Sequence, residues 1–322
     1  MIDKPKPNVC VSIEPDLIAA ATGEAAPTAA ERVHNHVATC VPCHDDFARY
    51  RAIDATVGEL RAAPPIADAE AARERLIARL ADIRSRILKY GIVASPIGPI
   101  LLARSELGVS LVEYLDRDGA VGSRLFQMAG IEAHEDGAEI ERLHHELLDY
   151  LEGRRTRLDW PLDLRLARSD FERAVLQATA TVPYGAVSSY TGIAGDVGKP
   201  AAVRAVAQAL RHNPLPIVVP CHRIVGLHGE LVGYAGNRIG LKERLLTVEG
   251  VPTDHTREAR VARRAMYHYD PNPDRQYCLP TCGDIVRRPL GQVKLFAHRE
   301  LAEATGLEPC LDCRPDLHPL PR

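Results

Sequence analysis

The stretch Pro220-Cys221-His222-Arg223-Ile224-Val225 decides how this sequence is interpreted. It follows the apolar run 215–219, which predicts a short buried strand that stops at Pro220, because proline removes a backbone donor from a strand. The thiolate of a cysteine is its reactive form, and an adjacent imidazole can take up the thiol proton. We therefore expect Cys221 to be a nucleophile at a strand end, with His222 as its base.

The residues around this stretch are similar to those of one protein family. Asn213-Pro214 precedes it, Val-Gly-Tyr-Ala-Gly follows at 232–236, and Glu249-Gly250 lies beyond. With these motifs, segment 88–251 resembles the O6-alkylguanine-DNA alkyltransferases, which move an alkyl group from a damaged DNA base onto their own cysteine. The resemblance implies a single-turnover methylated-DNA–protein-cysteine S-methyltransferase for O6-alkylguanine and O4-alkylthymine in double-stranded DNA, without S-adenosylmethionine.

The resemblance also implies a role for individual residues. Cys221 is the acceptor, His222 removes its proton through a bridging water, and Glu249 orients this histidine as in a catalytic triad. Asn213 ties together the turns around the site, and Tyr190 protonates the departing guanine. The implied substrate pocket comprises Ile224, Tyr234 and Ala235. Beyond it, Asn237 stands where the family more often has a second glycine.

A predicted helix at 200–212 has the features of a DNA-binding element. It follows predicted helices at 171–180 and 190–194 and a turn at 195–200, and Pro200 suits the first position of a helix. One face carries an apolar stripe, which consists of Val203, Val206, Ala207 and Leu210. The opposite face, which we expect to contact DNA, consists of Ala201, Arg204, Ala205, Gln208 and Arg211.

Small side chains on this face favour the minor groove, since a major-groove helix needs longer polar side chains. By the resemblance, Arg204 replaces the nucleotide that is extruded from the duplex. The formal net charge of the chain is −3, so attraction to DNA must be local. Segment 197–229 has no acidic residue, and its positive charges are Lys199, Arg204, Arg211 and Arg223.

The length of 322 residues predicts two or three domains. The sequence contains no apolar run long enough to span a membrane, and its start lacks the apolar region of a signal peptide. We therefore expect a cytoplasmic monomer without a membrane partner. Since disulfides are rare in the cytoplasm, the 8 cysteines indicate two metal sites, one near each end, and a free thiol at Cys221.

The first cysteine group begins just before a predicted helical segment at 11–60, which contains its other members. It comprises Cys10, His36, Cys40 and Cys43, which together offer three thiolates and an imidazole for tetrahedral zinc. His34 and His44 are alternative ligands. The segment resembles the zinc-binding (ZAS) domains of anti-sigma factors, and a sigma-factor-like protein is the partner that this resemblance implies.

The second group is Cys278-x3-Cys282 followed by Cys310-x2-Cys313, a pattern typical of structural zinc. It resembles the zinc domain of the bacterial adaptive-response (Ada) protein, in which the thiolate matching Cys278 accepts methyl groups from DNA phosphotriesters. Two features differ from that family: the lead-in before Tyr277 is largely missing, and Leu279 replaces an arginine. A purely structural zinc site is therefore the alternative.

The predicted fold is an α/β subdomain joined to a mainly α, winged-helix-like methyl-transfer domain, with small zinc modules at both ends. The expected boundaries are 1–62 (ZAS-like), 63–90 (linker helix), 91–165 (α/β), 166–252 (methyl transfer) and 253–322 (Ada-like). The alternative function is a non-catalytic lesion-binding protein, or a sensor of alkylation or redox state, that signals through the N-terminal zinc module.

Overall fold

The structure, a computed structural model, describes residues 8–61, 69–115, 123–236, 238–255, 258–271 and 274–321. It divides into two compact units, residues 1–81 and 82–322. The predicted domain boundary at 62/63 and the loop residue Asn237 lie outside the described residues. Among the described helices, none combines the length and the apolar character that crossing a membrane requires.

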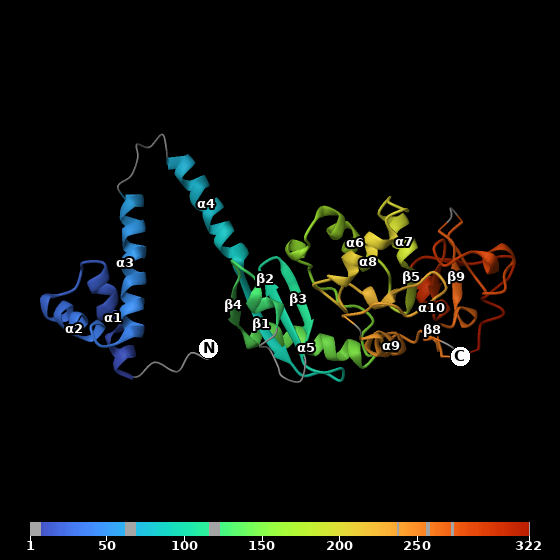
Figure 1. Cartoon of the computed structure of the whole chain (residues 1–322), viewed down its shortest axis with the longest axis horizontal. Helices are drawn as coiled ribbons and strands as arrows, with labels where there is room; N and C mark the ends of the chain where they lie inside the picture. The colour runs from blue at the N-terminus through green and yellow to red at the C-terminus, as the bar shows by residue number, and fades with distance from the viewer. Residues whose placement is uncertain are drawn as a thin grey trace. The chain divides into compact units, whose positions relative to one another are not determined.

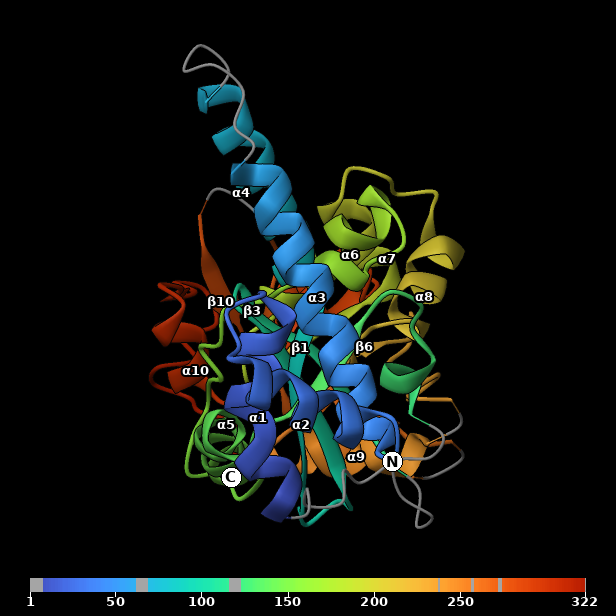
Figure 2. The same ribbon diagram turned by 90° about the vertical axis from the view of Figure 1, so that its left-hand side faces the viewer.

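The first unit contains the helices α1 (Asn8–Ala21), α2 (Pro27–Val37) and α3 (Val41–Arg61). All three pack on one another, as Figure 2 shows. Pro27 opens α2, where a missing N–H costs no hydrogen bond, and Gly23 has the positive φ of 74° that the preceding turn requires. The small core comprises Cys10, Leu17, Val33 and Cys43.

The second unit begins with a four-stranded sheet in the order β3-β2-β1-β4. The strands β1, β2 and β3 are antiparallel neighbours, whereas β4 runs parallel to β1. Helix α5 (Gly137–Leu151) packs on β1, where a Cβ atom at Gly91 would lie 2.8 Å from Ile140. The strands are β1 (Ile87–Val93), β2 (Ile100–Ser105), β3 (Gly108–Tyr114) and β4 (Glu132–Glu135).

The linker helix predicted at 63–90 ends earlier in the structure, because α4 spans Ala69–Arg86 and β1 starts at Ile87. Residues 87–90 all pair with β4, and Lys89 and Tyr90 pair with β2 as well. Pairing with other strands therefore decides the conformation of this segment. The apolar side chains of Leu76, Leu80 and Ile83 on α4 are exposed.

The next part of the second unit is mainly helical. Helices α6 (Asp170–Ala180), α7 (Tyr190–Asp196) and α8 (Val203–Arg211) pack against one another (Figure 1), and α9 (Ile239–Val248) follows. Three predicted helices are thus confirmed, but α8 starts three residues after Pro200. The predicted strand at 215–219 is wrong: Pro214, Pro216 and the positive φ of Ile217 (75°) make this segment a series of turns.

A six-stranded sheet in the order β12-β10-β9-β11-β5-β6 completes the unit. Its strands β5 and β6 belong to the predicted methyl-transfer segment 166–252, whereas β9 to β12 come from residues after 252. The sheet therefore continues across the predicted boundary at 252/253, and Figure 1 shows β9 and α10 beside β5. The strand β9 lies in the segment before Tyr277 and pairs antiparallel with β10.

The elements of this sheet are β5 (Ala186–Ser189), β6 (Ile224–Val225), β9 (Tyr267–Tyr269), β10 (Gln276–Cys278), β11 (Lys294–Phe296), β12 (Glu308–Pro309) and helix α10 (Arg299–Ala304). A two-stranded ribbon of β7 (Thr253–Asp254) and β8 (Arg260–Val261) lies outside it. The 3-10 helices are η3 (Arg124–Gln127), η4 (Leu164–Leu166), η5 (Cys221–Arg223), η6 (Arg263–Ala265) and η7 (Gly283–Arg287).

Candidate functional site

Cys221 begins the 3-10 helix η5 and is only 7% exposed. Asn213 Nδ2 donates to the Cys221 sulfur at 3.2 Å and to the carbonyl of Val219 at 2.9 Å. Its Oδ1 accepts from the backbone N–H of Leu215 at 2.9 Å. One amide side chain therefore connects Leu215 and Val219, in the turns before the thiol, with the Cys221 sulfur.

The environment of Cys221 acts on its ionisation in opposite directions. Burial raises the pKa of the thiol, while the hydrogen bond from Asn213 and the charge of Lys242 lower it. Lys242 is itself fully buried, where its Nζ donates to the carbonyls of Ile224 at 2.5 Å and Val232 at 2.9 Å. Burial lowers the Lys242 pKa to about 8, which leaves the ammonium mostly charged at neutral pH. The resting thiol is consequently protonated and needs a base.

His222 is the base next to the thiol. Its Nε2 lies 2.6 Å from Glu249 Oε1, and both side chains are fully buried. Its Nδ1 is also buried and has no hydrogen-bond partner among the described residues. Burial lowers the pKa of His222, although the Glu249 carboxylate opposes this shift. A neutral imidazole with its Nδ1 unoccupied is able to take up a proton.

Glu249 is held by a dense set of donors. Arg223 Nε donates to its Oε2 at 2.9 Å, the Gly185 N–H donates to the same oxygen at 3.0 Å, and the Tyr150 hydroxyl donates to Oε1. Burial alone would raise the pKa of this carboxyl, but Arg223 and His222 outweigh burial and lower it to about 2. Glu249 therefore stays ionised at any physiological pH.

The position of Arg223 corrects the sequence analysis, which counted it among the positive charges available to DNA. The side chain is buried, and it donates to Glu249 and to the Val182 carbonyl at 2.5 Å. The loss of solvation is compensated by this ion pair, so Arg223 belongs to the support of the site and does not contribute to a DNA-binding surface.

A cavity of about 760 Å³ opens beside Cys221. It lies between α8 and the loop at 226–236, and its lining includes Tyr190, Arg204, Gln208, Cys221, Tyr234 and Ala235. The Tyr190 hydroxyl donates to the Val232 carbonyl at 3.1 Å, and burial raises the Tyr190 pKa, so this phenol remains protonated. The predicted pocket residue Ile224 is instead fully buried in β6 and is not part of the cavity lining.

Tyr234 connects the cavity to the α/β subdomain. Its hydroxyl lies 2.6 Å from that of Tyr114 in β3, and its ring meets the His222 ring edge to face at a centroid distance of 6.3 Å. A second cavity of about 220 Å³ reaches Cys221 from the side of Tyr114 and Asn213. Although Cys221 has a low exposed fraction, it lines both of these cavities.

Helix α8 presents the face that its sequence pattern predicts. Val206 and Leu210 are buried, whereas the opposite side is exposed. The exposed residues are Ala201, Arg204, Ala205, Gln208 and Arg211. Since Arg204, Gln208 and Arg211 also line the cavity beside Cys221, a duplex that contacted this face would lie at the mouth of the cavity.

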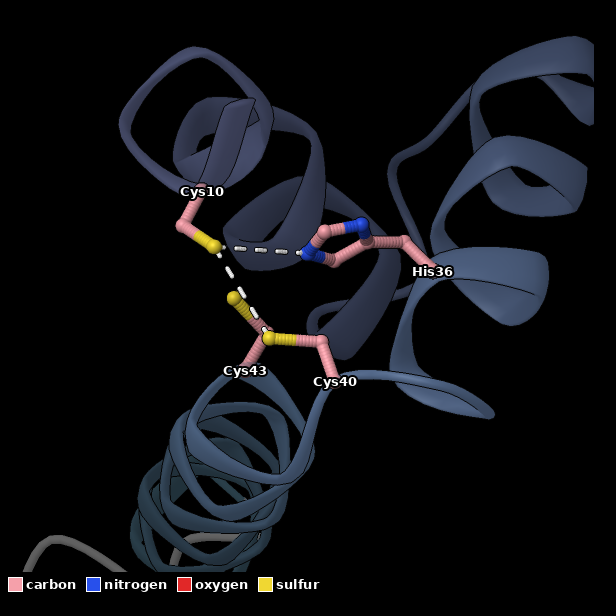
Figure 3. A group of neighbouring side chains, drawn as sticks. All are labelled: Cys10, His36, Cys40 and Cys43. Atoms are coloured by element: carbon pink, nitrogen blue, oxygen red, sulfur yellow. Dashed lines mark hydrogen bonds between the residues drawn. The ribbon is translucent and has the colours of Figure 1, made fainter. Parts of the chain in front are cut away.

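The first cysteine group converges as predicted. Cys10 comes from α1, His36 from α2, Cys40 from the residue just before α3 and Cys43 from the first turn of α3, and their side chains point toward one another in Figure 3. The Cys10 sulfur lies 3.7 Å from both the Cys40 sulfur and His36 Nε2. Four ligands at about 2.3 Å from a tetrahedral zinc would have sulfur atoms roughly 3.8 Å apart, so the donor set fits this ion.

The second cysteine group also converges. The sulfur atoms of all four residues lie within 4.8 Å of one another, and this group comprises Cys278, Cys282, Cys310 and Cys313. Four thiols at this spacing are the donor set of structural zinc sites. The alternative ligands His34 and His44 of the first group are exposed and belong to neither group.

Three supporting residues were missed by the sequence analysis as parts of the site. Tyr150 lies 99 positions before Glu249, and Gly185 contacts Glu249 through its backbone, so no sequence motif connects them. Lys242 was not assigned to the site. Lys242 lies three and four positions before Leu245 and Leu246, on the apolar face of α9, and this placement is a signal that could have indicated a buried charge.

Comparisons with known proteins match segment 88–251. The family model of the 6-O-methylguanine DNA methyltransferase ribonuclease-like domain matches residues 88–164, and that of the DNA binding domain matches residues 170–251. A methylated-DNA–protein-cysteine methyltransferase of Methanosarcina barkeri is 38% identical over 162 residues, which cover 50% of this chain and 96% of the relative.

Two further relatives give the same picture. The constitutive methylated-DNA–protein-cysteine methyltransferase of Bacillus subtilis is 33% identical over 162 residues, with 50% of this chain and 95% of the relative covered. The crystal structure of Mycobacterium tuberculosis OGT in complex with DNA is 36% identical, covers 51% of this chain and 92% of that chain, and has a TM-score of 0.42.

Proposed function

Because the chain belongs to the methylated-DNA–protein-cysteine methyltransferase family, we propose that it repairs DNA by moving an alkyl group from O6-alkylguanine onto Cys221. The observation that supports this most strongly is the buried thiol beside a cavity, with a histidine and an ionised carboxylate behind it. O4-alkylthymine is a second substrate in this proposal. No S-adenosylmethionine is needed, since the damaged base supplies the methyl group.

Activation of Cys221 starts from a protonated thiol in a buried site. The thiol proton moves to His222 Nδ1, the buried nitrogen without a described partner, with a water molecule as the bridge. Glu249 stabilises the imidazolium that forms, because its Oε1 lies 2.6 Å from Nε2 and its low pKa keeps it ionised. The amide of Asn213 and the ammonium of Lys242 stabilise the thiolate.

Methyl transfer is a single displacement at carbon. The Cys221 sulfur forms a bond to the methyl carbon while the bond from that carbon to O6 breaks, and its electron pair remains on the guanine. The Tyr190 hydroxyl gives the departing base a proton, which its raised pKa keeps available at neutral pH. The thioether product has no route back to a thiol, so each chain acts once.

Access to a base in duplex DNA requires that the nucleotide leaves the helix. The exposed face of α8 contacts the minor groove in this proposal, with small residues at the closest approach and Arg204 in the space of the extruded nucleotide. The base then enters the cavity of about 760 Å³, closed by Tyr234 and the backbone at Ala235. The helix-turn-helix of α7 and α8 forms part of a winged-helix-like domain.

The replacement Cys221→Ser tests the proposed acceptor. We expect a loss of methyl transfer by roughly three orders of magnitude or more, because a hydroxyl is a much weaker nucleophile than a thiolate. Binding to O6-methylguanine duplex should remain near the wild-type level, since α8 is unchanged. The measurement is transfer of labelled methyl from duplex DNA to protein, and full transfer by the serine protein would contradict the proposal.

Both cysteine groups are proposed to bind zinc, which would cross-link the elements that carry the ligands. The N-terminal group belongs to a ZAS-like module whose partner is a sigma-factor-like protein.

The C-terminal group is Ada-like, and Cys278 is the proposed second acceptor, for methylphosphotriesters. Partial exposure of Cys278 supports that role, because a backbone triester needs access to the sulfur. A cytoplasmic monomer remains a prediction.

A lesion-binding protein or sensor without transfer activity is the alternative function. The same site would then hold the damaged base without accepting its alkyl group. Retention of the thiol together with His222, Asn213, Tyr190 and Glu249 favours transfer, because binding alone does not require a polarised thiol. Binding of O6-methylguanine duplex with no methyl on the protein would identify the sensor.

A further inference from the structure

The C-terminal module reaches the support of the methyl-transfer site through a continuous sheet. Strand β11 pairs antiparallel with β5, where Phe296 lies opposite Ala186. Its other edge pairs with β9, which pairs in turn with β10, the strand that contains Cys278. Cys278 and strand β5, which follows Gly185, are therefore parts of one hydrogen-bonded sheet.

Gly185 is the residue at which the module and the site meet. Its carbonyl accepts from the N–H of Ala297 at 2.8 Å, and its own N–H donates to Glu249 Oε2 at 3.0 Å. Its φ is +67°, and a Cβ atom at this position would overlap Leu301 Cδ1. Leu301 of α10 thus packs directly on a backbone segment whose N–H orients Glu249.

A second contact lies at Gly250, the residue that follows Glu249. Gly250 has a φ of +73°, and a Cβ atom there would lie 2.8 Å from His298 Nε2. Residues 297–301 consequently restrain both the backbone that binds the Glu249 carboxylate and the residue that follows it in the chain. Nothing in the mechanism above used these contacts.

We propose that Leu301, supported by β11, is a positioning residue for the Glu249–His222 pair, so that the C-terminal module tunes the reactivity of Cys221. This inference rests on the proposed function of that site. When Leu301 is shortened, Gly185 gains room to rotate and its N–H moves away from Glu249. The carboxylate then holds His222 less firmly, and the imidazole becomes a weaker acceptor of the thiol proton.

Titration of this site depends on several groups that face it. Glu249 contacts His222 and Arg223 of η5 and Tyr150 of α5, and His222 also faces the Tyr234 ring. The titratable and charged groups nearby on other elements are Lys242, Tyr184 and His298. A Leu301 variant changes none of these groups. A shift in the pH dependence of Cys221 alkylation in such a variant would therefore reflect a change in how the groups are arranged.

The experiment compares full-length wild type, Leu301→Ala and Leu317→Ala. Leu317 is a matched control, since it lies in the same module but is 61% exposed. Iodoacetamide alkylation of Cys221, followed by peptide mapping from pH 6 to about 10, measures thiolate formation without DNA. For Leu301→Ala we expect a midpoint at higher pH and alkylation at pH 7 slower by about 10-fold, with zinc content unchanged.

A Leu301→Ala protein that folds, as judged by circular dichroism and zinc content, yet has the wild-type midpoint would overturn the proposal. If Leu301→Ala does not fold, Leu301→Val is used, and an unchanged profile in that variant overturns it as well. The two results can also be observed separately: if Leu301→Ala shifts the pH profile of alkylation while the wild-type protein takes no methyl group from DNA, the positioning role is supported and the repair function is contradicted. The two claims therefore fail separately.

Discussion

His222 Nε2 lies 2.6 Å from Glu249 Oε1, and neither side chain has any exposure to solvent. The pair sits directly behind Cys221, and its outer end is fixed by Arg223. A buried imidazole whose second nitrogen already faces a carboxylate has only Nδ1 left for proton transfer.

Arg204→Ala is expected to separate extrusion of the base from chemistry. If Arg204 fills the space of the extruded nucleotide, repair of O6-methylguanine in duplex DNA should slow by about 10-fold or more, whereas reaction with free O6-benzylguanine needs no extrusion and should change little. Single-turnover rates on both substrates measure the difference. Arg142→Ala, an exposed arginine on α5, is the control. Equal losses on both substrates would place Arg204 in the pocket or the fold.

Glu249→Gln should destabilise the protein in a way that depends on pH. The Glu249 pKa is lowered from 4.5 to about 2 in the folded chain. Its ionised form therefore stabilises the fold fully above pH 4.5, and this contribution is lost as the pH falls toward about 2. At pH 7 the variant leaves Arg223 without its buried partner, at a cost of about 3 kcal/mol in the free energy of unfolding.

Urea denaturation at several pH values tests this expectation. The difference between wild type and Glu249→Gln should be largest near neutral pH and should shrink below pH 4.5. Glu141→Gln, which changes an exposed carboxylate on α5, is the matched control and should have little effect. A difference that stays constant down to pH 3 would show that Glu249 is not the stabilising anion.

Metal analysis should find two zinc ions per chain in reduced full-length protein. Deletion of residues 1–61 should remove one ion and leave methyl transfer intact, because those residues belong to a separate compact unit. Deletion of residues 270–322 should remove the other ion and also weaken transfer, because it removes β11, the partner of β5. A content of one or zero in the full chain would contradict the two-site assignment.

Cys278 is expected to accept methyl from phosphotriesters if it has the role of its Ada counterpart. Cys221→Ser protein is incubated with DNA that carries only methylphosphotriesters, so that any label on the protein must come from the backbone. Label on Cys278 in a peptide map would establish a second acceptor. Cys313→Ser, which alters a different ligand of the same group, controls for effects on the metal site. With no label at any protein excess, the group has a structural role alone.

Local sequence patterns predicted which side chains come together in this chain better than they predicted the conformation of its backbone. The Cys221 motif and the spacing within the two cysteine groups identified residues that meet in space, because each motif combines rare residue types at fixed intervals. The faces of α8 followed equally from helical periodicity. Hydrophobicity alone was misleading at 215–219, where three prolines in the segment 214–220 produce turns in place of the expected strand.

Relationships between distant segments could not be predicted from one sequence. The Tyr150–Glu249 hydrogen bond joins α5 to the end of α9, and the β11–β5 pairing extends the methyl-transfer segment into the C-terminal module. Neither leaves a local signal, since a strand of three residues such as β11 has no periodicity to detect. Arg223 was assigned to the DNA-binding surface for the same reason, because its buried partner Glu249 is 26 positions away in the sequence.

The most direct test of the proposed repair function is the mass spectrum of the wild-type chain after reaction with an excess of O6-methylguanine duplex. The account predicts the addition of one methyl group per chain, located by peptide mapping on Cys221, with unmodified guanine restored in the DNA. A chain that binds the duplex but keeps its original mass, or that carries the methyl on another residue, would contradict it.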